Sequence, residues 1–280
     1  MTSAEKQVIA GYDGSPDSEQ ALGWAVGEAR LHKAVLTICH AWEPSPEAPA
    51  SGGTATSGAQ RRGEQLLTDA MHRARMGLGC AEVRPLLATG PPARVLCELS
   101  GAAAMVVVGS RGRDRLAKAL LGSVSLQVAA YANGSVTVVR GHWRPVPDKA
   151  VAPVVVGTDG SGPAQAAMAF AFAEAARRAA PLNAVCALAD TPGVLGAAHR
   201  IEADFDQALA KYGPDYPEVA LQRSVRQGAP RSALLEAASG AQLLVVGARG
   251  RGDMREMPLG SVSLAVLHYA PCPVSIIREG

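Results

Sequence analysis

The chain contains MVVVGSRGRDRLAKALLGS at residues 105–123 and LLVVGARGRGDMREMPLGS at residues 243–261. Each stretch begins with an unbroken apolar run, which is typical of a central parallel strand covered on both faces. Each run leads directly into the same spacing, G-x2-G-x9-G-S. Ligands of open parallel sheets bind beyond the carboxyl ends of the strands, where both glycine motifs lie. The two stretches therefore predict two copies of an α/β fold, each with a ligand site after a central strand.

The rest of the sequence repeats in the same order. VIAGYDGS at residues 8–15 recurs as VVVGTDGS at 154–161, which is 146 positions later, whereas the glycine motif recurs 138 positions later. The first copy is therefore longer, and the Pro-, Gly-, Ser- and Thr-rich residues 43–58 are the expected site of the extra length, as a mobile loop. Residues 141–153 carry three prolines and suit an interdomain linker. We predict domains at residues 1–142 and 150–280.

Short β-branched runs alternate with helical periodicity in each copy, which favours parallel strands joined by crossover helices. Ser15 followed by Pro16 predicts the start of a helix. In the first copy the expected strands lie near residues 7–12, 35–41, 83–88, 104–109 and 136–140. The predicted fold class is α/β, with two tandem domains that are each a five-stranded parallel sheet flanked by helices, a Rossmann-like arrangement.

Composition narrows the class of protein. The 280 residues are 48% hydrophobic, and 27 Lys and Arg against 25 Asp and Glu give no support for a nucleic-acid or anionic-membrane partner. No run is long enough for a transmembrane helix and the start is unlike a signal peptide, so we expect a cytoplasmic protein. Five cysteines without a C-x-x-C pair and six scattered histidines predict neither a disulfide framework nor a metal site.

The glycine motif suits a phosphate group. Glycines at 109 and 112 allow a tight turn and a close approach of the backbone to a ligand. Gly122 and Ser123 open a helix whose free N–H groups favour an anion, with the hydroxyls of Ser123 and Ser125 as further donors. The cations expected to bind phosphate oxygens are Arg111, Arg113, Arg115 and Lys118. In the alternative interpretation the glycines only end strands and helices, and the repetition of the spacing favours the ligand.

Asp13 and Asp159 follow the first strands of the two copies. Each is either a turn or helix cap, or an acceptor for a ribose hydroxyl or adenine amino group. A strand order that places Asp13 beside Gly109 would favour the ligand role. Neither G-x4-G-K-[ST] nor a G-x-G-x-x-G after a first strand is present, so P-loop hydrolases and standard Rossmann dehydrogenases lack their defining residues here.

Both halves resemble the universal stress protein family in its tandem-domain form. The resemblance rests on the opening V-x-x-G-x-D-G-S, the second strand ending in CHAW, the G-x2-G-x9-G-[ST] signature, and the terminal strands VTVVR and VSIIR. It implies the family's five-stranded fold, and members with this signature bind ATP. The implied contacts in the first copy are Gly11, Asp13, Ala41, Gly109, Arg111, Gly112, Arg115, Gly122, Ser123, Val124 and Ser125. Those in the second copy are Gly157, Asp159, Ala187, Gly247, Arg249, Gly250, Gly260, Ser261, Val262 and Ser263.

The second copy departs from this pattern. CHAW becomes CALA, so that His40 and Trp42 are lost, and Asp253 and Glu256 enter the basic loop. Trp42 and the longer 43–58 loop can cover a nucleotide in the first copy. We therefore expect the first site to bind ATP more tightly.

The leading hypothesis is a cytoplasmic ATP-binding regulator of stress response or dormancy, with one adenine-nucleotide site per domain and ATP bound with or without Mg²⁺. The resemblance implies a homodimer of tandem chains and a regulatory protein partner. A slow ATPase or nucleotidyl-transfer enzyme is an alternative, but the motifs supply no general base or nucleophile, so we expect no enzyme. A scaffold without ligand is a second alternative. The sequence does not separate ATP from AMP or a cyclic dinucleotide.

Overall fold

The computed structural model describes residues 6–44, 54–78, 82–112, 121–141, 152–188, 195–251 and 257–278. The chain divides into two compact units, residues 1–142 and 143–280. In the first unit the strands and helices are β1 (Gln7–Gly11), α1 (Pro16–His32), β2 (Val35–Trp42), α2 (Thr54–Leu78), β3 (Val83–Thr89), α3 (Pro92–Ser100), β4 (Met105–Gly109), α4 (Ser123–Tyr131) and β5 (Val136–Val139).

The second unit repeats this order of elements. It contains β6 (Val154–Thr158), α5 (Gly162–Arg178), β7 (Leu182–Leu188), α6 (Leu195–Tyr212), the short 3₁₀ helix η1 (Gly213–Asp215), β8 (Leu221–Gln227), α7 (Pro230–Ala237), β9 (Leu243–Gly247), α8 (Ser261–Tyr269) and β10 (Val274–Ile277). None of the helices in the described ranges is long and apolar enough to cross a membrane.

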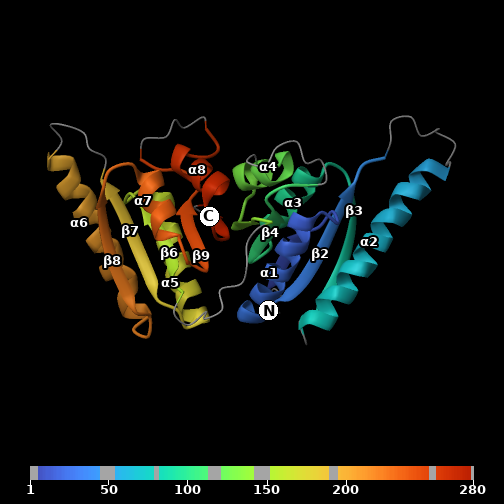
Figure 1. The fold of residues 1–280 in the computed structure, drawn as a ribbon, viewed down its shortest axis with the longest axis horizontal. Helices are drawn as coiled ribbons and strands as arrows, with labels where there is room; N and C mark the ends of the chain where they lie inside the picture. Colours follow the sequence, from blue (N-terminus) through green and yellow to red (C-terminus); the bar gives the residue numbers. More distant parts are fainter. Residues whose placement is uncertain are drawn as a thin grey trace. The chain divides into compact units, whose positions relative to one another are not determined.

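Each unit is a parallel five-stranded sheet, as predicted. The strand order is β3-β2-β1-β4-β5 in the first unit and β8-β7-β6-β9-β10 in the second. Helices α1 and α2 contact each other and the sheet, and α3 and α4 form a second contacting pair (Figure 1). The second unit pairs α5 with α6 and α7 with α8 in the same way. This is the doubly wound arrangement expected from alternating strands and helices.

The core follows the sequence pattern. Strands β4 and β9 are buried at every position, as their unbroken apolar runs predicted. Helix α1 begins where Ser15 and Pro16 predicted, because the Ser15 hydroxyl accepts a hydrogen bond from the Ser18 N–H at 3.2 Å. Ser161 caps α5 by the same bond to the Ala164 N–H, at 3.4 Å.

One expectation about the first unit is wrong. Residues 54–58, predicted as part of a mobile loop, form the start of the long helix α2. Residues 45–53 and 142–151, which hold most of that loop and most of the predicted linker, lie outside the described residues.

Candidate functional site

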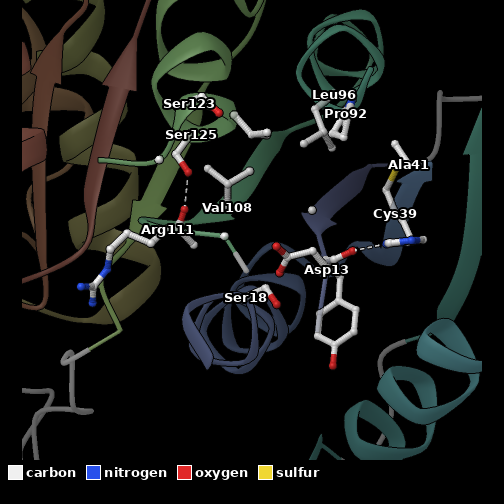
Figure 2. A pocket seen from close by; sticks show the side chains of 17 residues that line it. Asp13, Ser18, Cys39, Ala41, Pro92, Leu96, Val108, Arg111, Ser123 and Ser125 are labelled. Atoms are coloured by element: carbon white, nitrogen blue, oxygen red, sulfur yellow. Dashed lines mark hydrogen bonds between the residues drawn. The ribbon is translucent and has the colours of Figure 1, made fainter. Parts of the chain in front are cut away.

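A cavity of the first unit lies where the strand order reverses. The chain runs from β1 to β2 on one side, while β4 lies on the other side of β1, with Ala10 opposite Val107. Such a switch point leaves a crevice beyond the strand ends, where ligands of open α/β sheets bind. A cavity of about 270 Å³ occupies this place (Figure 2). Asp13 and the glycine motif are therefore neighbours, which is the condition that the sequence left open.

The first cavity gathers almost all of the predicted residues of its copy. The predicted residues that line it are Gly11, Asp13, Ala41, Gly109, Arg111, Gly112, Gly122, Ser123, Val124 and Ser125. The remaining one, Arg115, lies outside the described residues, as do Arg113 and Lys118. Trp42, expected to cover a ligand, does not line the cavity within the described part of the chain.

Seven further residues line the cavity and were not predicted. They are Tyr12, Ser18, Cys39, His40, Pro92, Leu96 and Val108. A Cβ placed on Gly11 would lie 2.9 Å from the Leu96 Cδ1 atom, so the α3 side chain forms an apolar wall against the end of β1. The sequence held a signal for this wall, because TGPPARVLCEL at residues 89–99 recurs as QGAPRSALLEA at 227–237.

Asp13 has the turn role that the sequence offered, and its second oxygen faces the glycine motif. Its Oδ1 atom accepts a hydrogen bond from the Ser15 N–H at 2.9 Å, which closes the turn before α1. Its Oδ2 atom faces the glycine motif, because a Cβ on Gly112 would lie 3.1 Å from it. Figure 2 shows the carboxylate beside Ser18 in the cavity. The turn role is therefore observed, and the second oxygen stands where an acceptor for a ligand is expected.

The first glycine of the motif serves packing in this structure. A Cβ on Gly109 would lie 2.6 Å from the carbonyl carbon of Asp17, in the first turn of α1. Gly247 has the same relation to Pro163, at 2.8 Å from its carbonyl carbon. Side chains at these positions would push the helix away from the sheet. The interpretation that the glycines have a structural purpose is therefore correct for this pair, whether or not a ligand binds.

Two side chains expected to bind phosphate are occupied otherwise. The Ser125 hydroxyl donates to the Gly109 carbonyl at 2.5 Å, and the Ser263 hydroxyl donates to the Gly247 carbonyl at 2.7 Å. A hydroxyl has one proton to donate, so in this structure the Ser125 hydroxyl, which the sequence suggested as an extra donor, is used within the fold, as is that of Ser263. They fix the end of the central strand to the following helix.

Arg111 also differs from its predicted role. Its Nε donates to Oδ2 of Asp17 at 3.2 Å, and the same oxygen accepts the Ser110 hydroxyl at 2.6 Å. The Asp17 side chain is only 6% exposed. Figure 2 shows the Arg111 side chain running away from Asp13. The backbone of Arg111 lines the cavity, while its guanidinium is committed to a buried carboxylate.

The first turn of α4 lines one part of the cavity. Gly122 is the N-cap of this helix, and no side chain in the described part of the chain caps it. The N–H groups of a first helical turn have no partner within the helix and carry the positive end of its dipole. Ser123, Val124 and Ser125 all line the cavity. This end favours a phosphate or another anion.

The opposite wall is formed by the ends of β1 and β2. His40 donates from Nδ1 to the Tyr12 carbonyl at 2.8 Å. The Tyr12 hydroxyl donates to Glu19 and accepts from Arg73. Burial first, and then Glu19, raise the pKa of Tyr12 by more than Arg73 lowers it. Burial raises the pKa of the Cys39 thiol to about 12, so this cavity-lining cysteine is a neutral thiol at physiological pH.

The corresponding cavity of the second unit is smaller, about 120 Å³. It contains the predicted residues Gly157, Asp159, Ala187, Gly247, Arg249, Gly250, Val262 and Ser263. It also contains the unpredicted residues Thr158, Ala164, Val185, Pro230, Leu234 and Val246. Gly260 and Ser261 do not line it, although their counterparts Gly122 and Ser123 line the first cavity. The second cavity therefore lacks the start of its anion-binding helix.

The register of the strands corrects the match between the two second strands. Gly11 lies opposite Cys39, and Gly157 lies opposite Val185. The counterpart of CHAW is therefore VCAL at residues 185–188, and not CALA. The second unit still lacks the histidine and tryptophan of the first, because Cys186 and Leu188 stand where the first unit has His40 and Trp42.

Comparison with known proteins gives one consistent result. The model of the universal stress protein family matches residues 5–140 and 151–278. A universal stress protein of Mycobacterium tuberculosis is 37% identical over 298 residues, which cover 100% of both chains. One from Mycolicibacterium smegmatis is 34% identical over 295 residues, 99% of each chain. The crystal structure of a universal stress protein from Archaeoglobus fulgidus covers 98% of each chain with a TM-score of 0.74 and 20% identity. The chain belongs to the universal stress protein family and carries two consecutive copies of its domain.

Proposed function

We propose that the protein is an ATP-binding regulator in a stress response, with an adenine-nucleotide site in each unit and the stronger site in the first. The observation that carries this proposal is the cavity at the switch point of the first unit. It brings together an acceptor, Asp13, and a helix start at Gly122 that no side chain of the described residues caps. Ribose hydroxyls need such an acceptor, and phosphates need such a helix start.

The part of the cavity at the end of β2 suits the adenosine moiety. Ala41 lies at the carboxyl end of β2, beside the apolar wall that Pro92 and Leu96 supply. A nucleoside base needs an apolar slot with a few backbone hydrogen-bonding groups at its edge. Resemblance to family members that bind ATP supports the same assignment.

The protein, in this proposal, binds ATP without hydrolysing it. Asp13 is the only carboxylate among the described residues that line the first cavity. Its Oδ1 is already used by the turn, and enzymatic phosphoryl transfer needs several positioned metal and water-orienting groups. We therefore propose that occupancy by ATP, with or without Mg²⁺, changes the binding of a regulatory partner. We further propose that the protein acts in the cytoplasm as a homodimer.

Calorimetric titration of ATP into the whole chain tests the proposal. The variants are Gly112→Val, Gly250→Val and the double variant, because both glycines line their cavities. We expect two sites in the unaltered protein, one in each single variant and none in the double variant. The site left in Gly250→Val should be tighter by about 1 kcal/mol, and moderate salt should reduce the difference, because the second loop carries Asp253 and Glu256.

Thermal unfolding of each variant is the control for folding. Two unchanged sites in the folded double variant would contradict the assignment. A different outcome would support the alternative of a slow ATPase. In that case the protein would release ADP as it binds ATP, and Gly112→Val would release none.

A further inference from the structure

Arg251 joins three parts of the second unit at the rim of its cavity. Its backbone N–H donates to Oδ2 of Asp159 at 2.7 Å. Its guanidinium donates to the Gly160 carbonyl at 3.3 Å and forms an ion pair with Asp204 of α6. The loop after β9 is thereby tied to the turn after β6 and to helix α6. We call this arrangement of Arg251, Asp159 and Asp204 the clasp.

The clasp depends on an acidic residue that the first unit does not have. Gly160 has a φ of +75°, and a Cβ built on it would lie 2.6 Å from Nη2 of Arg251 and 3.0 Å from Cβ of Asp204. Gly14 occupies the same turn in the first unit with a φ of +77°. The α2 side chain that meets Gly14 is Leu66, whose Cδ2 would lie 2.8 Å from such a Cβ. An apolar side chain cannot hold an arginine by charge, so among the described residues of the first unit Leu66 takes the place of Asp204 without forming such an ion pair.

The clasp also occupies the acceptor that the cavity would offer. Oδ1 of Asp159 accepts from the Ser161 N–H at 2.9 Å, and Oδ2 accepts from Arg251. Gly250, the residue before Arg251, lines the cavity, so its position follows that of the clasped loop. The cavity has about 120 Å³ against about 270 Å³ in the first unit.

We propose that the clasp keeps the second site closed, and that a nucleotide enters this site only after the ion pair between Arg251 and Asp204 opens. This inference rests on the proposed nucleotide function. It assigns Asp204, outside the family signature, as the residue that regulates affinity at the second site. Opening the ion pair removes the tie between Arg251 and α6. Residues 248–251 can then move, so that the Arg251 N–H leaves Oδ2 of Asp159 free to accept a ribose hydroxyl.

The size of the effect follows from the exposure of the pair. The side chains of Arg251 and Asp204 are 40% and 43% exposed. Exposed ion pairs contribute little, so release of the clasp should tighten ATP binding at the second site by about two- to fivefold. Salt screens such a pair, so the gain should shrink as salt rises.

Asp204→Asn and Asp204→Leu are the variants that open the clasp, the second by installing the side chain that Leu66 supplies in the first unit. Asp206→Asn is the matched control, because Asp206 lies on the same helix and pairs with Arg223 instead. The first measurement needs no nucleotide. Limited trypsin digestion with mass spectrometry follows cleavage after Arg251, with cleavage after Arg111 of the first unit as the internal reference.

The second measurement is titration of ATP into the same variants in a Gly112→Val background, where only the second site remains. We expect faster cleavage after Arg251 and tighter ATP binding in both Asp204 variants. We expect neither change in Asp206→Asn. Unchanged cleavage would show that the clasp does not hold the loop. Faster cleavage with unchanged or weaker ATP binding would overturn the closure.

The two proposals fail in different ways in this experiment. If no protein binds ATP, including the unaltered chain, the proposed function is wrong and the closure of a nucleotide site falls with it. In that case faster cleavage after Arg251 in the Asp204 variants would still show that the clasp holds the loop. If the unaltered chain binds ATP at the first site alone and the Asp204 variants gain no second site, the closure is wrong and the second unit has no nucleotide site, while the proposed function of the first unit stands.

Discussion

The first turn of α1 and the first turn of α5 occupy the same place in the two units and differ in chemistry. In α1 this turn carries Asp17, which is buried and accepts from Ser110 and Arg111. In α5 the same place is taken by Pro163, and Ala248 stands where the first unit has Ser110. The second unit therefore keeps the shape of the turn without this polar network.

What the two units do share at this point is a close approach of the backbone. Gly109 meets Asp17 and Gly247 meets Pro163 at almost the same distance. A repeated glycine is thus explained by packing of a helix on a strand end. The residues that distinguish one site from the other, such as Asp17, Leu66 and Asp204, lie outside the repeated motif.

The largest effect is expected from Gly109→Ala. The added Cβ would lie 2.6 Å from the Asp17 carbonyl carbon, and backbone atoms cannot turn aside as a side chain can. Overpacking of this kind costs about 3 kcal/mol, which corresponds to a fall of about 10 °C in the melting temperature of a unit of this size. Calorimetry or circular dichroism of the unligated chain measures it.

Gly23→Ala is the matched control for this substitution. Gly23 lies exposed within α1, and nothing lies within 4 Å of an added Cβ there. Alanine should raise the free energy of unfolding by about 0.5–1 kcal/mol at this site. If Gly109→Ala unfolds at the temperature of the unaltered chain, the packing explanation of the repeated glycine is wrong.

The next largest effect is expected from Asp17→Ala. Removal of this buried carboxylate leaves Ser110 and Arg111 without their shared acceptor, and the half-buried Arg111 regains only part of its hydration. The expected loss is about 2 kcal/mol in the free energy of unfolding. Ser110→Ala, which installs the residue of the second unit, should cost less, about 1 kcal/mol. Chemical denaturation of both variants measures the difference.

Equal losses in the two variants would show that the Ser110 hydroxyl, and not the pair with Arg111, carries the network. If the stability of Asp17→Ala were unchanged, the network would be dispensable. The second unit, which folds without this network, makes that outcome conceivable.

The fold could be predicted from the sequence because its signals are local. The unbroken apolar runs of β4 and β9, the cap at Ser15 and the repeat at fixed offsets each depend on a few neighbouring residues. Ten of the residues that line the first cavity could be predicted for the same reason, since they sit at strand ends, in the glycine loop and at one helix start, whereas the wall from α3 could not.

The roles of several side chains could not be predicted, because they depend on partners distant in the sequence. Arg111 is turned toward Asp17, 94 positions earlier, and Arg251 toward Asp204, 47 positions earlier. Ser125 donates to a carbonyl that the sequence does not mark as an acceptor. Basic residues and hydroxyls in a glycine loop predict phosphate ligands. In the folded chain some of these side chains instead form hydrogen bonds with other groups of the protein.

The smallest expected difference between the units lies in the alkylation rates of two buried thiols on corresponding strands. Cys39 lines the first cavity, whereas the matching position of the second cavity is Val185, and the neighbouring Cys186 does not line it. Burial raises the pKa of Cys39 to about 12 and that of Cys186 to about 11. Both react as thiolates, so alkylation should be slow at pH 7 and about a hundredfold faster at pH 9, since both pH values lie below both pKa values.

A bound nucleotide should separate the two thiols. ATP at ten times its dissociation constant should slow alkylation of Cys39 by about tenfold, because the thiol is reached only through openings of the first site that the ligand suppresses. Under the same conditions Cys186 should react as fast as it does without ATP, as long as the second site is empty. The half-buried Cys97 of α3 serves as a reference for general reactivity. Mass spectrometry of the alkylated peptides gives the three rates. Equal protection of Cys39 and Cys186 would mean that ATP stabilises the whole chain instead of filling the first cavity, and absence of protection at Cys39 would remove the cavity as the nucleotide site.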